Sequence, residues 1–216
     1  MPALRIRYQT IEFDQVDIHV RTLRDKQQYL DRDNAAQKLN ISSASWPLFG
    51  VVWSSSRILA ELLCDYDIGG KRILEVGCGI GLSSLLLNQR QANITATDHH
   101  PEAEHFLSEN VKLNQGRAIP FVRTGWAEKK SSLGRFDLII GSDLLYEQDH
   151  VELLSGFINR HAAEHCEVII VDPGRGLHPR FSHKMTGLGF EHNKSKPRQR
   201  QELEPPFRGV ILHYNR

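Results

Sequence analysis

The chain has 216 residues, 40% of them hydrophobic, and a formal net charge of +1. This length can bury the core of one α/β domain, and the balanced charge points to no particular partner. Three widely spaced cysteines argue against a disulfide framework and are typical of a reducing compartment. We see no signal peptide, and no stretch approaching the ~18 apolar residues of a membrane span. We therefore expect a soluble, cytoplasmic protein.

The N-terminal part differs in pattern from the rest of the chain. Residues 4–24 contain two stretches in which apolar and polar residues alternate, which predicts a β-ribbon. Residues 25–45 are polar and predict a loop or short helices. A helix with apolar positions Ile58, Leu59, Leu62 and Leu63 is expected from Ser54 onward. We interpret residues 1–45 as an extension that packs on one domain spanning residues 46–216.

From Arg72 onward, short apolar runs alternate with amphipathic segments. Because these runs are continuously apolar, both faces of each expected strand should be buried. The expected strands cover 72–76, 93–98, 119–124, 136–143 and 166–172, and the expected helices cover 82–90, 101–113, 151–163 and 178–188. Two further strands, at 189–196 and 208–216, predict a C-terminal antiparallel hairpin. The pattern predicts an α/β fold: a Rossmann-like, doubly wound, mostly parallel seven-stranded sheet with an N-terminal β-ribbon.

A glycine-rich turn follows the first expected core strand. Gly77, Gly79 and Gly81 depart from the dinucleotide fingerprint G-x-G-x-x-G, because position 82 is Leu. The same position has no lysine, which excludes a P-loop. Glu75 stands two residues before the turn, where a carboxylate would repel a pyrophosphate and attract a cationic group.

Asp98 ends the next expected strand, about twenty residues after the glycines. An acidic residue at this spacing can accept hydrogen bonds from ribose hydroxyls. These positions favour a ligand with a ribose, a cationic group and no phosphate. S-adenosylmethionine meets all three conditions, and we predict it as the cofactor. The alternative is that the glycines only allow a helix to pack closely against a strand.

Several segments resemble a known family. The segments "LEVGCGIGL", "ATDHHP" and "FDLIIGSDLLYEQDHVELL" are similar to class I, seven-β-strand methyltransferases, and more narrowly to family 16, which contains many protein lysine methyltransferases. The Trp-bearing "VVWSSSRILAELL", the motif "DLLY" and the Trp in "RTGWAE" are the more specific signals. The resemblance extends from about residue 46 to residue 172. It departs from the family at Gly125, where Asp is frequent. The segment "VDPGRGLHPRF" also resembles electron-transfer-flavoprotein β-subunit lysine methyltransferases.

The resemblance and the spacing together assign roles to eleven residues. The expected cofactor-binding residues are Trp53, Glu75, Gly77, Gly79, Gly81, Asp98, His99, Trp126 and Ser142. Glu75 and the glycines would hold the methionine part, and His99 would lie near the adenine. Asp143 and Tyr146 are the expected catalytic residues, which would receive and orient a substrate amine. The structural alternatives are a core position for Trp53 and a helix N-cap for Asp143.

The implied reaction is methylation of a lysine side-chain nitrogen in a protein substrate. A small-molecule amine as the acceptor, or a cofactor-binding module without catalysis, are the alternatives. Nucleic acid is a less favoured substrate, because the "NPPY"-type motif of amino-group methyltransferases is absent at 142–145.

Two further features carry weaker signals. The pairs His99–His100 and His161–His165 lack zinc-ligand spacing, so no metal site is expected. The basic run Lys194–Arg200 is expected to be a solvated charge run rather than a partner surface. Oligomeric state has no signal in the sequence.

Overall fold

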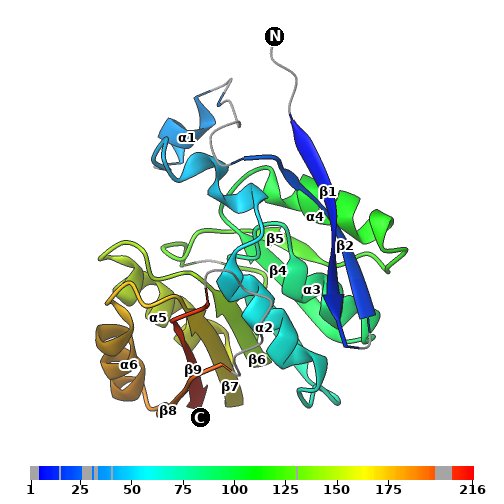
Figure 1. Ribbon diagram of the computed structural model, residues 1–216. Helices are drawn as coiled ribbons and strands as arrows, with labels where there is room; N and C mark the ends of the chain where they lie inside the picture. The colour runs from blue at the N-terminus through cyan, green and yellow to red at the C-terminus, as the bar shows by residue number, and fades with distance from the viewer. Residues whose placement is uncertain are drawn as a thin grey trace.

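The computed structural model describes residues 5–14, 16–25, 31, 34–39, 41–129, 131–197 and 206–216. Its centre is a seven-stranded sheet with the strand order β5-β4-β3-β6-β7-β9-β8 (Figure 1). The strands are β3 (Arg72–Val76), β4 (Asn93–Asp98), β5 (Phe121–Arg123), β6 (Phe136–Ser142), β7 (Ala162–Asp172), β8 (Glu191–Ser195) and β9 (Val210–Asn215). Strands β3 to β7 are parallel, and β9 is antiparallel to β7 and β8. The predicted fold class is confirmed.

Helices cover both faces of the sheet, as the apolar strands require. They are α2 (Ser54–Cys64), α3 (Leu82–Gln89), α4 (Ala103–Leu113), α5 (His150–His161) and α6 (His178–Gly187). Successive strand residues point to opposite faces. Leu138 therefore packs in the core under α2, α3 and α4, and Ile139 packs in the core under α5 and α6. Figure 1 shows these two helical layers on opposite sides of the sheet.

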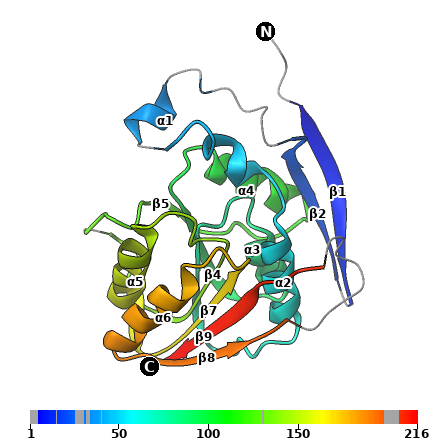
Figure 2. The same cartoon turned by 60° about the vertical axis from the view of Figure 1, so that its left-hand side comes forward.

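The N-terminal ribbon is β1 (Ile6–Phe13) paired antiparallel with β2 (Val16–Leu23). Figure 2 shows it alongside α3 and α4, outside the main sheet. Asn110 of α4 accepts a hydrogen bond from Arg21 N at 2.7 Å and donates to Arg21 O at 3.3 Å. Asn114 forms the same pair of contacts with His19, at 2.8 and 2.6 Å. The two amides therefore act as a third strand for β2, while the division of the chain near residue 45 stays a prediction.

One described stretch is long and apolar enough to cross a membrane by length and composition: residues 46–64, with a mean hydropathy of 1.2. This differs from the expectation that the chain has no such stretch. In the fold the stretch is a 3-10 helix, η1 (Trp46–Gly50), followed by α2, with Val51 extended between them. Leu59 and Leu63 are fully buried in the core. The stretch therefore forms a core helix preceded by a turn.

Several element boundaries differ from the expected ones, and the largest difference is at the start of β7. β7 begins at Ala162 rather than Cys166, because α5 ends at His161 and the backbone turns directly into the extended conformation at Ala162. A register shift between Phe136 and Leu138 of β6 accommodates this early start. The polar residues 25–45 contain a short helix, α1 (Ala35–Lys38), among the positions that the structure describes.

Candidate active site

The expected site residues gather at the carboxyl edge of the parallel strands. β3 lies between β4 and β6, so the strand order reverses beside β3. A reversal of this kind opens a crevice at the carboxyl ends of the strands, where α/β proteins bind ligands. The glycine turn follows β3, Asp98 ends β4, and Ser142 ends β6. Trp126 follows β5, and Trp53 immediately precedes α2.

The glycine turn has a left-handed backbone at all three glycines, with φ values of 63° at Gly77, 55° at Gly79 and 81° at Gly81. Packing also excludes side chains here. A Cβ on Gly77 would lie 2.6 Å from Leu144 Cδ2, and one on Gly81 would overlap Leu107. Leu144 belongs to the motif "DLLY", so Gly77 lets the motif after β6 pack against the turn. The glycines therefore let neighbouring protein groups pack closely against the turn.

Glu75 lies beneath the turn, with only 3% of its surface exposed. Its carboxylate accepts hydrogen bonds from Ser84 N at 3.0 Å and from the Ser84 hydroxyl. Burial raises the pKa of Glu75 to about 7, although the serine hydrogen bonds oppose the shift. None of these partners carries a positive charge. A cation placed beside this carboxylate would stabilise its ionised form.

Asp98 connects β4 to the glycine turn. Its two oxygens accept hydrogen bonds from Gly79 N and His100 N, each at 2.8 Å. Burial raises the pKa of Asp98. Each carboxylate oxygen has two lone pairs, so a ribose hydroxyl could share these acceptors. His99 pairs with Leu39 O at 3.0 Å, and its ring lies over Gly125, where a Cβ would be 3.2 Å from His99 Nδ1.

Trp53 and Trp126 have different partners. Trp126 extends to the turn, since its Cζ2 would lie 4.0 Å from a Cβ on Gly77. Its ring meets the ring of His150 edge-on, with centroids 5.0 Å apart. Trp53 donates its indole N–H to Leu48 O at 3.0 Å and is partly buried. Trp126 therefore faces the turn directly, whereas Trp53 is tied to η1.

Asp143 has a left-handed backbone, with a φ of 57°, just after β6. This conformation is uncommon for a residue with a side chain, although Asp tolerates it better than most. Two nitrogens of Arg175 contact the same Asp143 oxygen, Oδ1: Nη2 at 2.7 Å and Nε at 3.0 Å. Sequence reasoning missed Arg175, although the segment "VDPGRGLHPRF" contains it.

Tyr146 and His150 complete this side of the site. Their rings meet edge-on with centroids 4.4 Å apart, so His150 lies between Tyr146 and Trp126. His150 Nδ1 lies 2.8 Å from Leu144 O, which requires a proton on Nδ1. Burial and nearby carboxylates raise the pKa of Tyr146 to about 12. Its hydroxyl therefore keeps its proton at neutral pH and serves as a hydrogen-bonding group rather than a base. His150 was not identified from the sequence.

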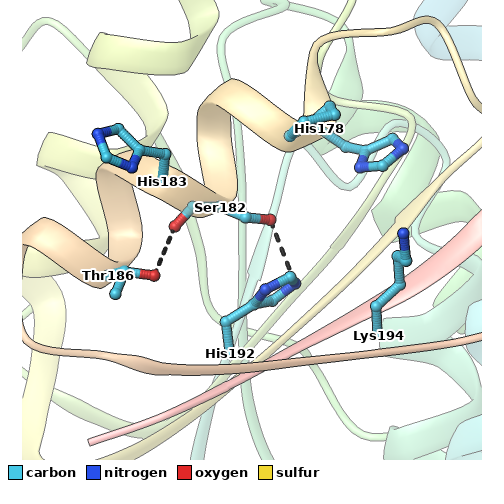
Figure 3. A pocket seen from close by; sticks show the side chains of 7 residues that line it. His178, Ser182, His183, Thr186, His192 and Lys194 are labelled. Carbon is cyan, nitrogen blue, oxygen red and sulfur yellow. Dashed lines mark hydrogen bonds between the residues drawn. The ribbon is translucent and has the colours of Figure 1, made fainter.

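Three other features remain, and one of them includes His150. A hollow of about 350 Å³ lies between α6 and β8 and is lined by polar and basic side chains (Figure 3). Ser182 lies within it and contacts His192 Nε2 at 3.2 Å. Among the described residues, Glu147, Asp149 and His150 form one group whose donor atoms lie within 4.8 Å of one another. Both acidic members are exposed, and exposed acidic groups are common without a metal. The basic run from Lys194 begins in β8, and its residues 198–200 fall outside the described part of the chain.

The donor set fits S-adenosylmethionine. The carboxylates of Glu75 and Asp98 accept hydrogen bonds from neutral donors and favour a ligand with positive charge, whereas Asp143 is paired with Arg175. Glu75 and Asp98 lie beside the turn, where they could hold an ammonium and a ribose. Trp126 could cover an apolar or aromatic part of the ligand.

Fold and site together define a Rossmann-like protein with three carboxylates at the sheet edge where its strand order reverses. A sequence profile of the lysine methyltransferase family matches residues 34–179. The chain belongs to this family, which confirms the resemblance seen in the sequence.

Individual relatives agree. The chain is similar to protein N-lysine methyltransferase METTL21A of Danio rerio, with 36% identity over 118 residues, 50% of this chain and 54% of the relative. It is also similar to the electron transfer flavoprotein beta subunit lysine methyltransferase of Rattus norvegicus, with 31% identity over 63% of this chain and 53% of the relative. The chain thus spans about half the length of these relatives. The fold resembles the T. thermophilus 16S rRNA N2 G1207 methyltransferase, with a TM-score of 0.68, 15% identity and coverage of 100% of this chain and 51% of that one.

Proposed function

We propose that this protein transfers a methyl group from S-adenosylmethionine to the side-chain nitrogen of a lysine in a protein substrate. The observation that carries the proposal is the position of Asp143 and Tyr146. Leu144, from the same motif, packs against the glycine turn at Gly77. Groups that could orient an amine are thereby fixed beside groups that could hold the cofactor. Membership of the lysine methyltransferase family supports this choice of acceptor.

The chemistry requires alignment more than a strong catalyst. S-adenosylmethionine supplies a methyl group activated by a positively charged sulfur. The protein must place a neutral amine in line with it and exclude water. Asp143 accepts a hydrogen bond from the amine, and Tyr146, protonated at neutral pH, can donate or accept a second one. Trp126 and His150 form an aromatic wall next to them.

Two measurements test the proposal in sequence. Calorimetry with S-adenosylhomocysteine should show binding to the purified protein, and its absence would overturn the cofactor assignment. The protein is then incubated with cell extract and cofactor carrying a radioactive methyl group. We expect label in a protein band and methyl-lysine after hydrolysis. Label in RNA or in the small-molecule fraction would show that the acceptor is not a protein. Cofactor binding without any transfer of label would favour a non-catalytic module.

The variant Asp143→Ala separates binding from catalysis. We expect it to lower turnover by about 100-fold while changing the affinity for S-adenosylhomocysteine by less than about threefold. Unchanged turnover would show that Asp143 has only a structural role.

We also propose that the protein works in the reducing environment of the cytoplasm. Cys64, Cys78 and Cys166 are free thiols. Burial raises the pKa of Cys64 and Cys166 to about 11, so neither forms an appreciable thiolate at neutral pH. The cysteines therefore act as small apolar side chains. Imaging of a tagged protein in cells of its source would test the location.

A further inference from the structure

Asp143 presents a chemical conflict if it binds the substrate amine. A carboxylate stabilises a neighbouring ammonium and so opposes the loss of its proton. An ammonium has no lone pair and cannot accept a methyl group. The pKa of a lysine side chain is ordinarily about 10.4, so only about one amine in a thousand is neutral at pH 7.5. A bare carboxylate at the acceptor site would make that fraction smaller still.

Arg175 resolves this conflict by its position. Its guanidinium approaches Asp143 Oδ1 with two nitrogens, at 2.7 and 3.0 Å. The Asp143 side chain is only 10% exposed, whereas the Arg175 side chain is 44% exposed. The carboxylate of the pair is therefore largely buried in the site, whereas the guanidinium is exposed to solvent at its edge. A neutralised carboxylate can still accept a hydrogen bond from an amine, but it attracts an ammonium much less.

The backbone on both sides of the pair is unusual. Gly174 and Gly176 flank Arg175 with φ values of 95° and 90°. A Cβ on either glycine would meet no atom within 4 Å, so packing does not require glycine there. The requirement is the left-handed backbone, which glycine adopts at no steric cost. At the start of the loop, the fully buried Asp172 accepts a hydrogen bond from Gly174 N at 2.8 Å.

Asp143 also has a left-handed backbone, so both members of the pair are presented by conformations that side-chain-bearing residues rarely adopt. Strained or special backbone of this kind clusters at functional sites. Two independently shaped loops, after β6 and after β7, thus converge on one ion pair at the carboxyl edge of the sheet. An ordinary surface ion pair contributes little to stability and would not need this arrangement.

We propose that Arg175 is a positioning residue that neutralises Asp143, so that the carboxylate orients the substrate amine without stabilising its unreactive ammonium form. The inference rests on the proposed function of the same site. The ammonium loses its proton to solvent water. Its lone pair then forms the new N–C bond while the S–C bond of the cofactor breaks, and the electron pair of that bond stays on sulfur.

The surrounding groups leave a clear pH window for a test. Asp98 and Glu147 are the other carboxylates that act on Tyr146, and Arg175 acts on it with the opposite sign. Carboxylates ordinarily remain ionised, and histidines neutral, between pH 7.5 and 9.5. Tyr146 keeps its proton throughout this range, since its pKa is about 12. Within the window, the neutral fraction of an amine rises roughly 100-fold, whereas Glu75, whose pKa is about 7, only completes an ionisation that is mostly finished at pH 7.5.

The first experiment measures amine binding without turnover. The probe is n-butylamine, titrated into the protein saturated with S-adenosylhomocysteine and followed by NMR at pH 7.5 and 9.5. We expect Arg175→Met to bind the amine about tenfold more tightly than the wild type at pH 7.5. We expect wild-type affinity to rise at least about tenfold by pH 9.5, as the neutral amine becomes abundant, and the affinity of the variant to rise much less.

Two matched variants complete the design. Arg175→Lys keeps the charge and should restore wild-type behaviour. Arg180→Met removes a charge from the same segment, but Arg180 donates to Gln148 Oε1 at 3.2 Å rather than to a carboxylate; it should behave as the wild type. Equal affinity and equal pH dependence for Arg175→Met and wild type would overturn the inference, as would failure of every variant to bind the probe. Failure of S-adenosylhomocysteine to bind would instead overturn the proposed function.

The second experiment uses the labelled acceptor protein found in extract. We expect Arg175→Met to lower kcat about tenfold at pH 7.5, to leave KM unchanged or lower, and to recover turnover towards pH 9.5. A structural role for Arg175 would lower turnover equally at both pH values or raise KM.

Discussion

Replacing Glu75 by glutamine tests whether burial raises the pKa of this carboxyl group in the ligand-free protein. Burial raises the pKa of Glu75 from 4.5 to about 7. Between these values the folded protein keeps a proton that the unfolded chain has lost, so the free energy of unfolding falls as pH rises. Each pH unit is worth about 1.4 kcal/mol, which gives about 3 kcal/mol over the whole interval. Below pH 4.5 and above pH 7 the contribution is constant.

Urea unfolding of the ligand-free protein at several pH values between 4.5 and 8 measures this contribution. We expect the wild type to lose about 3 kcal/mol more than Glu75→Gln over that range. The other titrating groups are common to both proteins, so the difference between the two curves isolates Glu75. Ser84→Ala is the control, because it should enlarge the pH-dependent loss of stability that Glu75→Gln removes. It removes the hydroxyl that stabilises the carboxylate, so the fall in stability should extend to higher pH.

The same carboxyl group should lose its proton when the cofactor binds. Calorimetry of S-adenosylhomocysteine at pH 6, in two buffers with different ionisation enthalpies, counts the protons released. We expect close to one proton from the wild type and none attributable to this site from Glu75→Gln, because a nearby ammonium favours the ionised carboxylate. Identical stability curves together with identical proton release in the two proteins would refute the reasoning.

Three other outcomes are expected. Gly81→Ala should lower the free energy of unfolding by about 3 kcal/mol, because the backbone there is left-handed and a Cβ would overlap Leu107. Gly176 has an equally left-handed backbone but lies in open space, so Gly176→Ala should lower it by only about 1 kcal/mol in the same urea assay. Asn110→Ala should cost about 2 kcal/mol and speed amide exchange in β2, since its side chain replaces a strand partner. Tyr146→Phe should reduce turnover about tenfold with little change in calorimetric affinity for S-adenosylhomocysteine, because only the hydroxyl proposed to orient the amine is lost.

The fold could be predicted from the sequence because its signals are local. Continuous apolar runs such as 136–142 identify buried parallel strands, and the glycine turn identifies the first strand and helix of the unit. The early start of β7 at Ala162 could not be predicted, since it depends on the register between β6 and β7. The role of Asn110 and Asn114 was equally hidden, because two polar residues on a helix give no sign of a strand alongside.

The site was predicted in its residue types but not in its contacts. Sequence spacing brought Glu75, Asp98 and Asp143 to one edge, which the topology explains. It gave no sign that Glu75 would turn beneath the glycines towards Ser84, or that Arg175 would reach Asp143. Ser84 is 9 residues from Glu75, and Arg175 is 32 residues from Asp143. Neither spacing shows in a single sequence that the two side chains meet. The positive φ at Asp143 was equally invisible, because Asp is common at ordinary positions after a strand.

The three carboxylates of the site fall into two groups with different partners. On the glycine-turn side, Glu75 and Asp98 are held by neutral donors, namely serine and backbone N–H groups. Burial raises the pKa of both, so each gains most from a ligand that brings its own positive charge. On the other side, Asp143 already has a cation in Arg175. A permanently charged cofactor benefits from the first arrangement, whereas an amine that must become neutral before it reacts benefits from the second.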